Sequence, residues 1–225
     1  VYKRQGALFA QWIPVSAVDE RGQGGVVFAP RESAGIEVID DWDSFGQRTT
    51  ASGTVVFDDV PVDALYAFPS AAQVKGLDTT SSVSQLIHAA IDLGIARRAI
   101  ADTIRMLKAN ANPARGSGAR SATEDTLTLR EIGKLKLHYT AAEVLLTRAA
   151  QAADAARVAQ DQALIEQTLI AVTEAKILTT EISLEAGSKL FELVGTHSTL
   201  NRYALDRHWR NARTHTSVSY THLRA

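Results

Sequence analysis

The segment GSKLFELVGTHSTLNRYALDRHWRNARTHT, Gly187–Thr216, contains two helical patterns separated by a polar turn. Apolar residues repeat at helical spacing up to Gly195, and glycine ends helices because it adopts a positive φ angle without a steric penalty. The next four residues are small or polar: Thr196, His197, Ser198 and Thr199. We expect Ser198 or Thr199 to cap a second helix over Leu200–His215.

A polar turn that precedes a helix suits an anion, because backbone N–H groups and the positive end of the helix dipole favour negative charge there. The simpler interpretation is a capped corner between two helices that binds nothing. If a phosphate binds, Ser198→Asp should weaken its binding roughly tenfold and leave the melting temperature nearly unchanged.

The composition is that of an ordinary globular protein. The 225 residues are 45% hydrophobic and 22% charged, with a net charge of −1, so no basic footprint for nucleic acid is present. No apolar run is long enough to span a membrane, and no membrane partner is expected. The absence of cysteine excludes a disulfide scaffold and thiolate metal sites, and the six histidines lack metal-site spacing. These features are compatible with a cytoplasmic protein that has no metal site.

The N-terminal third of the sequence predicts strands. Short segments rich in β-branched and aromatic residues are separated by turn residues, namely Ala7–Val15, Val26–Pro30, Ile36–Ile39 and Thr54–Val60. Four such segments make a partial antiparallel sheet, too small to close a barrel.

From Ser82 onward the apolar residues follow a helical period, with a break at Asn112–Pro113 and new starts at Thr128 and after Asp161. With Leu200–His215 this predicts a four-helix up-down bundle. The fold class is therefore α+β, with a partial antiparallel β-domain over residues 6–66 and a C-terminal bundle over residues 78–216.

Three details of the bundle can be predicted from spacing. Gly94 lies within a helix, which indicates a crossing where another backbone comes close. Arg98 and Asp102 are four residues apart and are expected to form a solvated pair of little energetic weight. The third helix has an unusually wide apolar stripe, so we expect a homotetramer assembled through Leu178, Ile182 and Ala186.

The chain resembles the acyl-CoA dehydrogenase superfamily at four places: Gly6–Val15, Phe45–Val62, Ala175-Lys176 and Arg210–Arg213. Within that superfamily, the sulfur-acquisition oxidoreductases, similar to dibenzothiophene monooxygenase, have the segments most like GQRTTASG, AAIDLGIAR, EAKILTTE, KLFELVGT and LDRHWRNARTHT. The resemblance covers roughly residues 6–216 and implies a fragment comprising the C-terminal half of the middle β-domain followed by the C-terminal bundle.

The resemblance also implies a function. Enzymes of this branch use reduced FMN, supplied by a separate flavin reductase, and dioxygen to oxygenate a small organosulfur compound. The turn residues Gly195, Thr196, His197 and Ser198 would contact the flavin phosphate, usually across a subunit interface. Arg48 and Ser52 would contact flavin or substrate, although a polar surface turn explains them equally well.

His215 is the candidate catalytic residue, because it matches the first histidine of a His-rich segment in this branch. An imidazole beside the flavin could donate a hydrogen bond or a proton to flavin-activated oxygen. The alternative is a histidine that only complements the C-terminal helix dipole.

Two departures from the family and two alternative functions remain open. Residues 1–5 and 217–225 do not fit the family and are expected to be non-native ends. The loop after the first helix lacks the usual phosphate-binding arginines, so Arg115 or Arg120 would have to substitute. The alternatives are an FAD-dependent acyl-CoA dehydrogenase, whose proton-abstracting carboxylate would fall at Ser219, and a non-catalytic helical assembly module.

Overall fold

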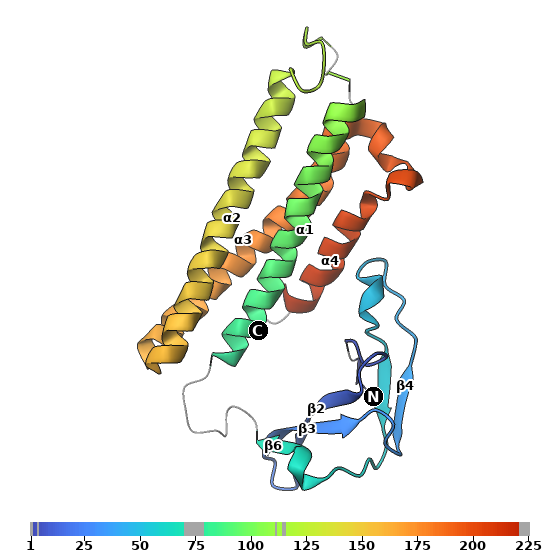
Figure 1. Cartoon of the computed structure of the whole chain (residues 1–225), viewed down its shortest axis with the longest axis vertical. Coiled ribbons are helices and arrows are strands. Elements are labelled where there is room, and N and C mark those ends of the chain that lie inside the picture. The colour runs from blue at the N-terminus through green and yellow to red at the C-terminus, as the bar shows by residue number, and fades with distance from the viewer. Residues whose placement is uncertain (1, 4, 70–78, 111, 114–115, 221–225) are drawn as a thin grey trace. The chain divides into compact units, whose positions relative to one another are not determined.

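The computed structural model describes residues 2–3, 5–69, 79–110, 112–113 and 116–220. The chain divides into two compact units, Val1–Gly76 and Leu77–Ala225. The first contains the strands and the second contains the long helices (Figure 1). The predicted α+β class, with a partial antiparallel β-domain and a four-helix up-down bundle, is confirmed. The suspect end residues 1, 4 and 221–225, and Arg115, lie outside the described residues.

The N-terminal unit contains two antiparallel sheets of three strands each. One has the order β1 (Tyr2–Lys3), β5 (Thr54–Phe57), β4 (Ile36–Ile39), and the other has the order β2 (Trp12–Val18), β3 (Gly24–Pro30), β6 (Ala67–Pro69). Ala7, Ile13 and Val55 form their shared core. The first long strand begins at Trp12 and not at Ala7, because Gly6 has a φ of 75° and its carbonyl closes a turn by accepting the Ala10 N–H.

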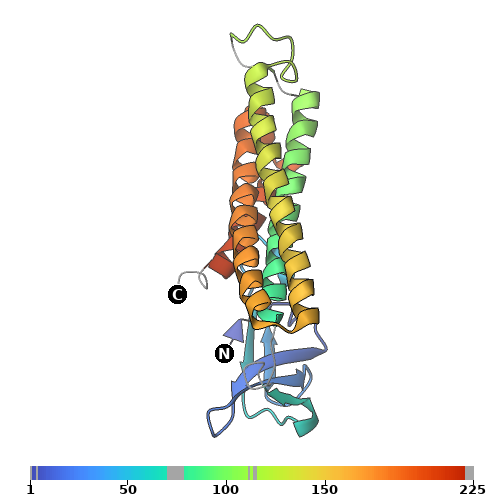
Figure 2. The same cartoon turned by 90° about the vertical axis from the view of Figure 1, so that its left-hand side faces the viewer.

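The C-terminal unit is built from α1 (Thr80–Asn110), α2 (Thr126–Ala159), α3 (Gln162–Val194) and α4 (Asp206–Tyr220). The turned view shows α1, α2 and α3 running side by side (Figure 2). The corner between α2 and α3 is sharp, because Gln160 adopts a positive φ and Asp161 caps α3 by accepting the Leu164 N–H at 3.0 Å. No helix in the described part of the chain is long and apolar enough to cross a membrane.

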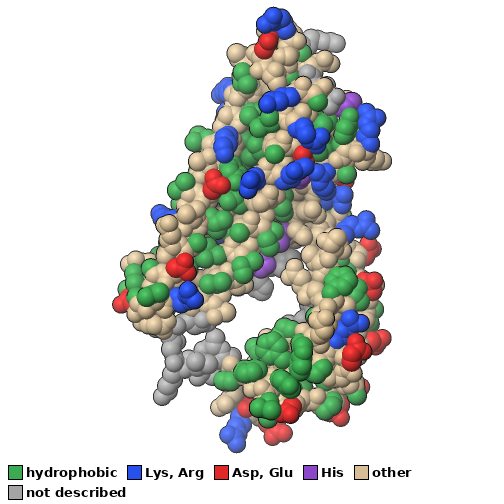
Figure 3. All heavy atoms as spheres, viewed as in Figure 1, with side chains coloured by type: hydrophobic (Ala, Val, Ile, Leu, Met, Phe, Trp, Pro, Cys, Tyr) green, Lys and Arg blue, Asp and Glu red, His purple; other side chains and the backbone are tan. Residues whose placement is uncertain are grey.

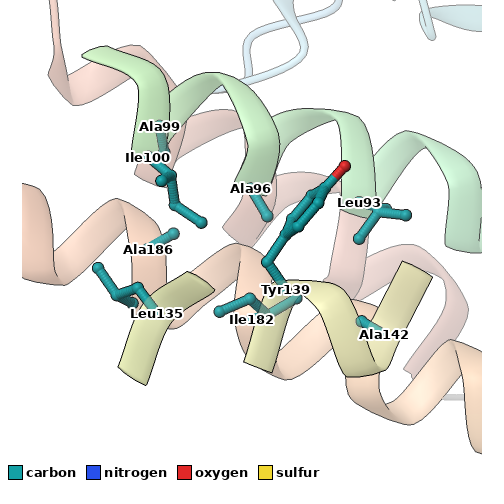
Figure 4. Packing of buried hydrophobic residues seen from close by; sticks show 9 residues of the cluster. All are labelled: Leu93, Ala96, Ala99, Ile100, Leu135, Tyr139, Ala142, Ile182 and Ala186. Carbon is teal, nitrogen blue, oxygen red and sulfur yellow. The ribbon is translucent and has the colours of Figure 1, made fainter. Parts of the chain in front are cut away.

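The bundle core is formed by small and medium side chains of α1, α2 and α3. Tyr139 of α2 reaches between Leu93 and Ala96 of α1 (Figure 4). Ile182 and Ala186 of α3 are fully buried in this cluster, and Leu178 packs against it. These three residues are therefore used inside one chain, and the prediction that they form an assembly face is wrong.

The close helix crossing lies at Gly187 and not at Gly94. A Cβ atom on Gly187 would lie 3.1 Å from the Trp209 Cα and 3.2 Å from the Trp209 backbone nitrogen. A Cβ atom on Gly94 would meet nothing within 4 Å. The absence of a side chain at Gly187 thus lets α4 approach α3, whereas Gly94 faces outward.

The corner after α3 differs from the predicted capped helix start. Gly195 ends α3 with a φ of 75°, as expected, and its N–H donates to the Phe191 carbonyl. Two 3₁₀ turns follow, Gly195–Thr199 and Asn201–Tyr203, and α4 begins only at Asp206. Ser198 Oγ donates backward to the Gly195 carbonyl at 2.6 Å, so it caps no following helix.

Candidate functional site

A buried ion pair joins α1 to α3. Lys176 Nζ donates to Asp92 Oδ2 at 2.6 Å, and Thr180 Oγ1 donates to the same oxygen at 3.1 Å. Asp92 is 0% exposed and Lys176 is 2% exposed. Charged side chains are this deeply buried only when they are paired and hydrogen-bonded, and each of these two satisfies the other.

His215 of α4 completes this site. Its Nδ1 lies 2.7 Å from Asp92 Oδ1, and its Nε2 lies 3.1 Å from Nδ1 of His88 on α1. His215 is only 6% exposed, whereas His88 is half-buried. We call the five side chains Asp92, Lys176, Thr180, His215 and His88 the relay cluster. It runs from a fully buried carboxylate to a histidine that reaches the surface of the bundle unit.

The electrostatics of the relay cluster favour an ionised Asp92 and a neutral His88. Burial alone would raise the pKa of Asp92, but hydrogen bonds from His215 and Lys176 outweigh it and hold the pKa below its usual value. Burial is the main cause that lowers the pKa of His88, followed by the nearby His215 and Lys176. The cluster can therefore hold a proton on imidazole nitrogens next to a fixed negative charge.

A second buried carboxylate, Asp102, joins α1 to the start of α4. Its oxygens accept from Arg105 at 3.1 Å and from Arg207 at 2.9 Å, and one lies 2.9 Å from His208 Nε2. Asp102 is 1% exposed, so the prediction of a solvated Arg98–Asp102 pair of little weight is wrong. Lys and Arg side chains gather on this face, where α1 and α4 lie side by side (Figure 3).

The same balance of forces acts on Asp102 and His208. Burial raises the pKa of Asp102, but hydrogen bonds from His208 and Arg105 outweigh it and lower the pKa overall. The pKa of His208 is lowered mainly by burial, although Asp102 opposes this. Asp102 therefore attaches the first turn of α4 to α1, and Asp92 attaches a later turn of α4 to α1 through His215.

The turn at Gly195–Thr199 lies at the far end of α3 from the relay cluster. An open pocket of about 600 Å³ is lined by the turn, by Leu127 and Thr128 of α2, and by Glu131 and Glu192. Lys189 pairs with both glutamates. The acidic lining disfavours a phosphate inside the pocket, so only the outer edge of the turn, at the exposed Thr196, offers a suitable surface.

The hydroxyl groups of the turn are already bonded to its own backbone. Ser198 is 1% exposed, and Thr199 Oγ1 donates to the Thr196 carbonyl at 2.7 Å. His197 Nε2 lies 2.8 Å from the Tyr203 hydroxyl. An aspartate at position 198 would be buried, so we now expect Ser198→Asp to lower the melting temperature and not to leave it unchanged.

Arg48 and Ser52 lie in the N-terminal unit, where Arg48 is exposed and Ser52 is half-buried. Arg48 starts a 3₁₀ turn between Gln47 and Ala51, both of which have positive φ angles, and Ser52 Oγ lies 2.8 Å from Thr50 Oγ1. Arg120, the suggested phosphate ligand, pairs with Glu124 at 3.2 Å. Within the described residues, no group of three or more His, Asp or Glu side chains is arranged to hold a metal ion.

The sequence predicted His215 but not its partners. The sequence suggested no role for Asp92 or His88, and Lys176 entered only through the resemblance of Ala175-Lys176 to the family. The signal was present: Asp92 falls between Ala89 and Ala96 on the buried side of α1. A lone carboxylate on a core face requires a buried cation, and Lys176 on the core face of α3 supplies it.

Comparison with known proteins identifies the family. Residues 86–222 match the model described as acyl-CoA dehydrogenase, C-terminal domain. The chain belongs to this family. The match spans the region of the bundle that contains the relay cluster, the Asp102 cluster and the turn.

Two similar proteins are monooxygenases by name. This acyl-CoA dehydrogenase-family chain is 33% identical over 219 residues to a probable FMNH2-dependent monooxygenase, SfnC, of Pseudomonas putida, covering 94% of this chain and 55% of that protein. It is 32% identical over 214 residues to a dibenzothiophene monooxygenase of Mycolicibacterium goodii, covering 88% of this chain and 51% of that protein. The chain thus spans about half the length of these relatives.

A solved structure gives the same result for the fold. The methanesulfinate monooxygenase MsuC of Pseudomonas fluorescens superimposes with a TM-score of 0.88 at 29% identity, covering 96% of this chain and 57% of that one. The arrangement of strands and helices in this acyl-CoA dehydrogenase-family chain therefore has a close structural counterpart among sulfur-compound monooxygenases.

The depressed pKa values predict a loss of stability in acid. His88 and His208 are held neutral in the fold, so the unfolded chain takes up protons first and the free energy of unfolding falls as pH drops below about 6.5. Asp92 and Asp102 are held ionised, so a second loss begins below about pH 4.

Urea unfolding at a series of pH values measures both steps. His88→Gln should reduce the step nearer neutrality, while His138→Gln, at an exposed position on α2, controls for the loss of a histidine. The range from pH 7 to pH 5 spans the ordinary histidine pKa of about 6.5. A free energy of unfolding that stays level across this range would contradict the burial of neutral imidazoles.

Proposed function

We propose that the chain is part of a flavin-dependent monooxygenase that uses reduced FMN and dioxygen to oxygenate a small organosulfur compound. The observation that carries the proposal is the relay cluster, in which a buried ionised Asp92 contacts His215 and His215 in turn contacts His88. The names of the relatives support the choice of reduced FMN and of a sulfur substrate. A separate flavin reductase in the cytoplasm would supply the reduced FMN.

The relay cluster suits proton transfer in such a reaction. When bound, reduced FMN supplies the electrons that split dioxygen, so that one oxygen atom enters the substrate and the other leaves as water. Protons must move to form that water, and paired imidazoles exchange protons near neutral pH. Gln85, one turn before His88, has a buried Oε1 with no hydrogen-bond partner among the described residues, so a donor on a bound molecule fits there.

The surface beside His88 is apolar. Val83, Ile87 and Ile91 of α1 are exposed by 43%, 58% and 40%, although large aliphatic side chains are usually buried. Residues four apart lie on the same side of a helix, so the three form one stripe next to His88. An uncharged organosulfur compound would bury this stripe on binding.

We propose that one FMN contacts two copies of the chain. From Lys176 to Gly195, α3 extends about 28 Å at 1.5 Å per residue, which exceeds the length of an extended FMN molecule. The relay cluster and the turn of one chain therefore cannot reach the same cofactor. The relay cluster of one copy would face the flavin whose phosphate lies at the exposed edge of the turn of another, at Gly195 and Thr196. His197 and Ser198, also predicted as phosphate contacts, would instead hold the shape of the turn through their bonds to Tyr203 and to the Gly195 carbonyl.

We further propose a homotetramer in which α3 contributes Ile170 and Ile177 to the subunit contacts. These residues are 63% and 46% exposed and are seven positions apart, so they lie on one face of the helix. They replace the buried Ile182 and Ala186 as candidates for assembly.

Light scattering should show smaller species for Ile170→Glu combined with Ile177→Glu, and no change for Val158→Glu. A tetramer that survives the double change would contradict this contact.

The activity is tested with a protein of the relatives' full length. A chimera would place this chain after the N-terminal portion of the Pseudomonas putida relative that it does not cover. With FMN, a flavin reductase and a thioether or sulfinate, labelled dioxygen should yield product that contains one labelled oxygen atom, detected by mass spectrometry. Tight copurification of FAD with oxidation of acyl-CoA would support the dehydrogenase instead, and absence of any flavin binding would support an assembly module.

Mixed assemblies test the shared cofactor site. In the chimera, Thr196→Asp places a negative charge at the turn and should weaken binding of reduced FMN about tenfold, or 1.4 kcal/mol. His88→Gln disables the relay cluster. When the two variants are assembled together, roughly a quarter of the sites combine an intact turn with an intact relay cluster, so activity should recover to that level.

The outcome separates the two arrangements. No recovery in the mixture would mean that one chain supplies both parts, and unchanged FMN affinity in Thr196→Asp would mean that the turn is only a helix corner.

Arg48 and Ser52 are proposed as further flavin or substrate contacts. Arg48→Gln should weaken FMN binding more than Arg21→Gln, which removes an exposed arginine from a hairpin loop; equal effects would dismiss that role.

A further inference from the structure

We propose that Lys176 sets the direction of the hydrogen bonds in the relay cluster, so that His88 presents an unprotonated Nε2 at the surface as the terminal base and His215 acts behind it as a positioning residue. That this base meets the substrate rests on the proposed function. The direction of the hydrogen bonds follows from the geometry alone and can be tested without turnover.

The charges of Asp92 and Lys176 decide the protonation state of His215. Asp92 and Lys176 lie 2.6 Å apart and are both buried, so their charges cancel. A proton added to His215 would leave a net positive charge in the core, which is costly. His215 is therefore neutral and carries a single ring proton. A carboxylate can only accept, so that proton lies on Nδ1 and points to Asp92 Oδ1 at 2.7 Å.

This assignment determines the state of His88. With its proton on Nδ1, His215 has a lone pair on Nε2 and can only accept there. The atom 3.1 Å away is Nδ1 of His88, which must therefore be the donor. A neutral His88 then has its lone pair on Nε2, and this nitrogen has no hydrogen-bond partner among the described residues. The surface end of the cluster is a proton acceptor.

His215 is less suited to this terminal role. Both of its ring nitrogens are engaged within the cluster, and its side chain is buried between α1 and α3. His88 lies on the exposed margin of the cluster beside the apolar stripe of Ile87 and Ile91. A proton accepted at His88 Nε2 leaves its charge at this margin and outside the core, while the hydrogen bond from His88 Nδ1 to His215 Nε2 keeps the ring oriented.

Removal of the lysine charge should reverse the hydrogen bonds. In Lys176→Met, Asp92 loses its cation, and the nearest group that can replace it is His215, which would take up a proton. A protonated His215 donates from both nitrogens. His88 Nδ1 must then accept, and its own proton moves to Nε2. The variant would thus convert the terminal base into a donor without any change at His88 itself.

Nitrogen-15 NMR of histidine-labelled full chain tests this directly, because protonated and unprotonated ring nitrogens have distinct shifts. In the wild-type chain near neutral pH, His88 should show a protonated Nδ1 and an unprotonated Nε2. Lys176→Met should exchange these two states, and Asp92→Asn with Lys176→Met should restore them, since asparagine accepts from a neutral His215. Lys176→Gln, which also lacks the charge, serves if the methionine variant does not fold.

Two results would overturn the proposal: a wild-type His88 that carries its proton on Nε2, or a lysine variant in which His88 keeps the wild-type state. In the full-length chimera, His88→Gln should lower turnover about 100-fold, whereas the exposed control His138→Gln should not. The expected NMR states without any monooxygenase activity would uphold the hydrogen-bond direction and reject the proposed function. Activity that survives in His88→Gln would reject His88 as the terminal base.

Discussion

A single buried carboxylate, Asp92, holds three helices of the bundle in place. It accepts from Lys176 and Thr180 of α3 and contacts His215 of α4, while its own backbone belongs to α1. Burial of a carboxylate costs several kcal/mol, and the cost is offset only when donors surround it in good geometry. The relative positions of α1, α3 and α4 are therefore fixed by one charge as well as by apolar packing.

Asp102 repeats this arrangement ten residues further along α1, about 15 Å away along the helix axis. It contacts Arg207 and His208 in the first turns of α4, whereas Asp92 contacts His215 later in the same helix. The polar helix α4 is thus attached at two points to α1. This double attachment orients His215, and through it His88, which is the geometry that proton transfer requires.

Much of the fold could be predicted from the sequence because helical periodicity, glycine and acidic caps act locally. The end of α3 at Gly195 and the cap at Asp161 are examples. The start of α4 was predicted too early, because the hydroxyls of Ser198 and Thr199 bond backward to carbonyls, which depends on the turn's own conformation. The assembly face was misassigned because periodicity shows that a stripe is apolar but not which neighbour covers it.

The candidate site was only partly visible in the sequence. His215 could be found from the motif that contains it, but its partners Asp92 and Lys176 are 123 and 39 positions away, and no local pattern links them. Likewise, the spacing of Arg98 and Asp102 predicted a surface pair, whereas Arg207 and His208 approach Asp102 only in the folded bundle. Long-range pairing of charges decides both clusters, and sequence spacing does not report it.

Asp92 and Lys176 stabilise the bundle as a pair, and a double-mutant cycle measures this dependence most directly. Urea unfolding of Asp92→Asn, Lys176→Met and the double variant gives the coupling free energy. Each single change should cost about 3–5 kcal/mol, because it leaves a buried charge without its partner, and the double variant should be more stable than either. Additive losses in the double variant would contradict the account, because they would show that the two charges do not depend on each other.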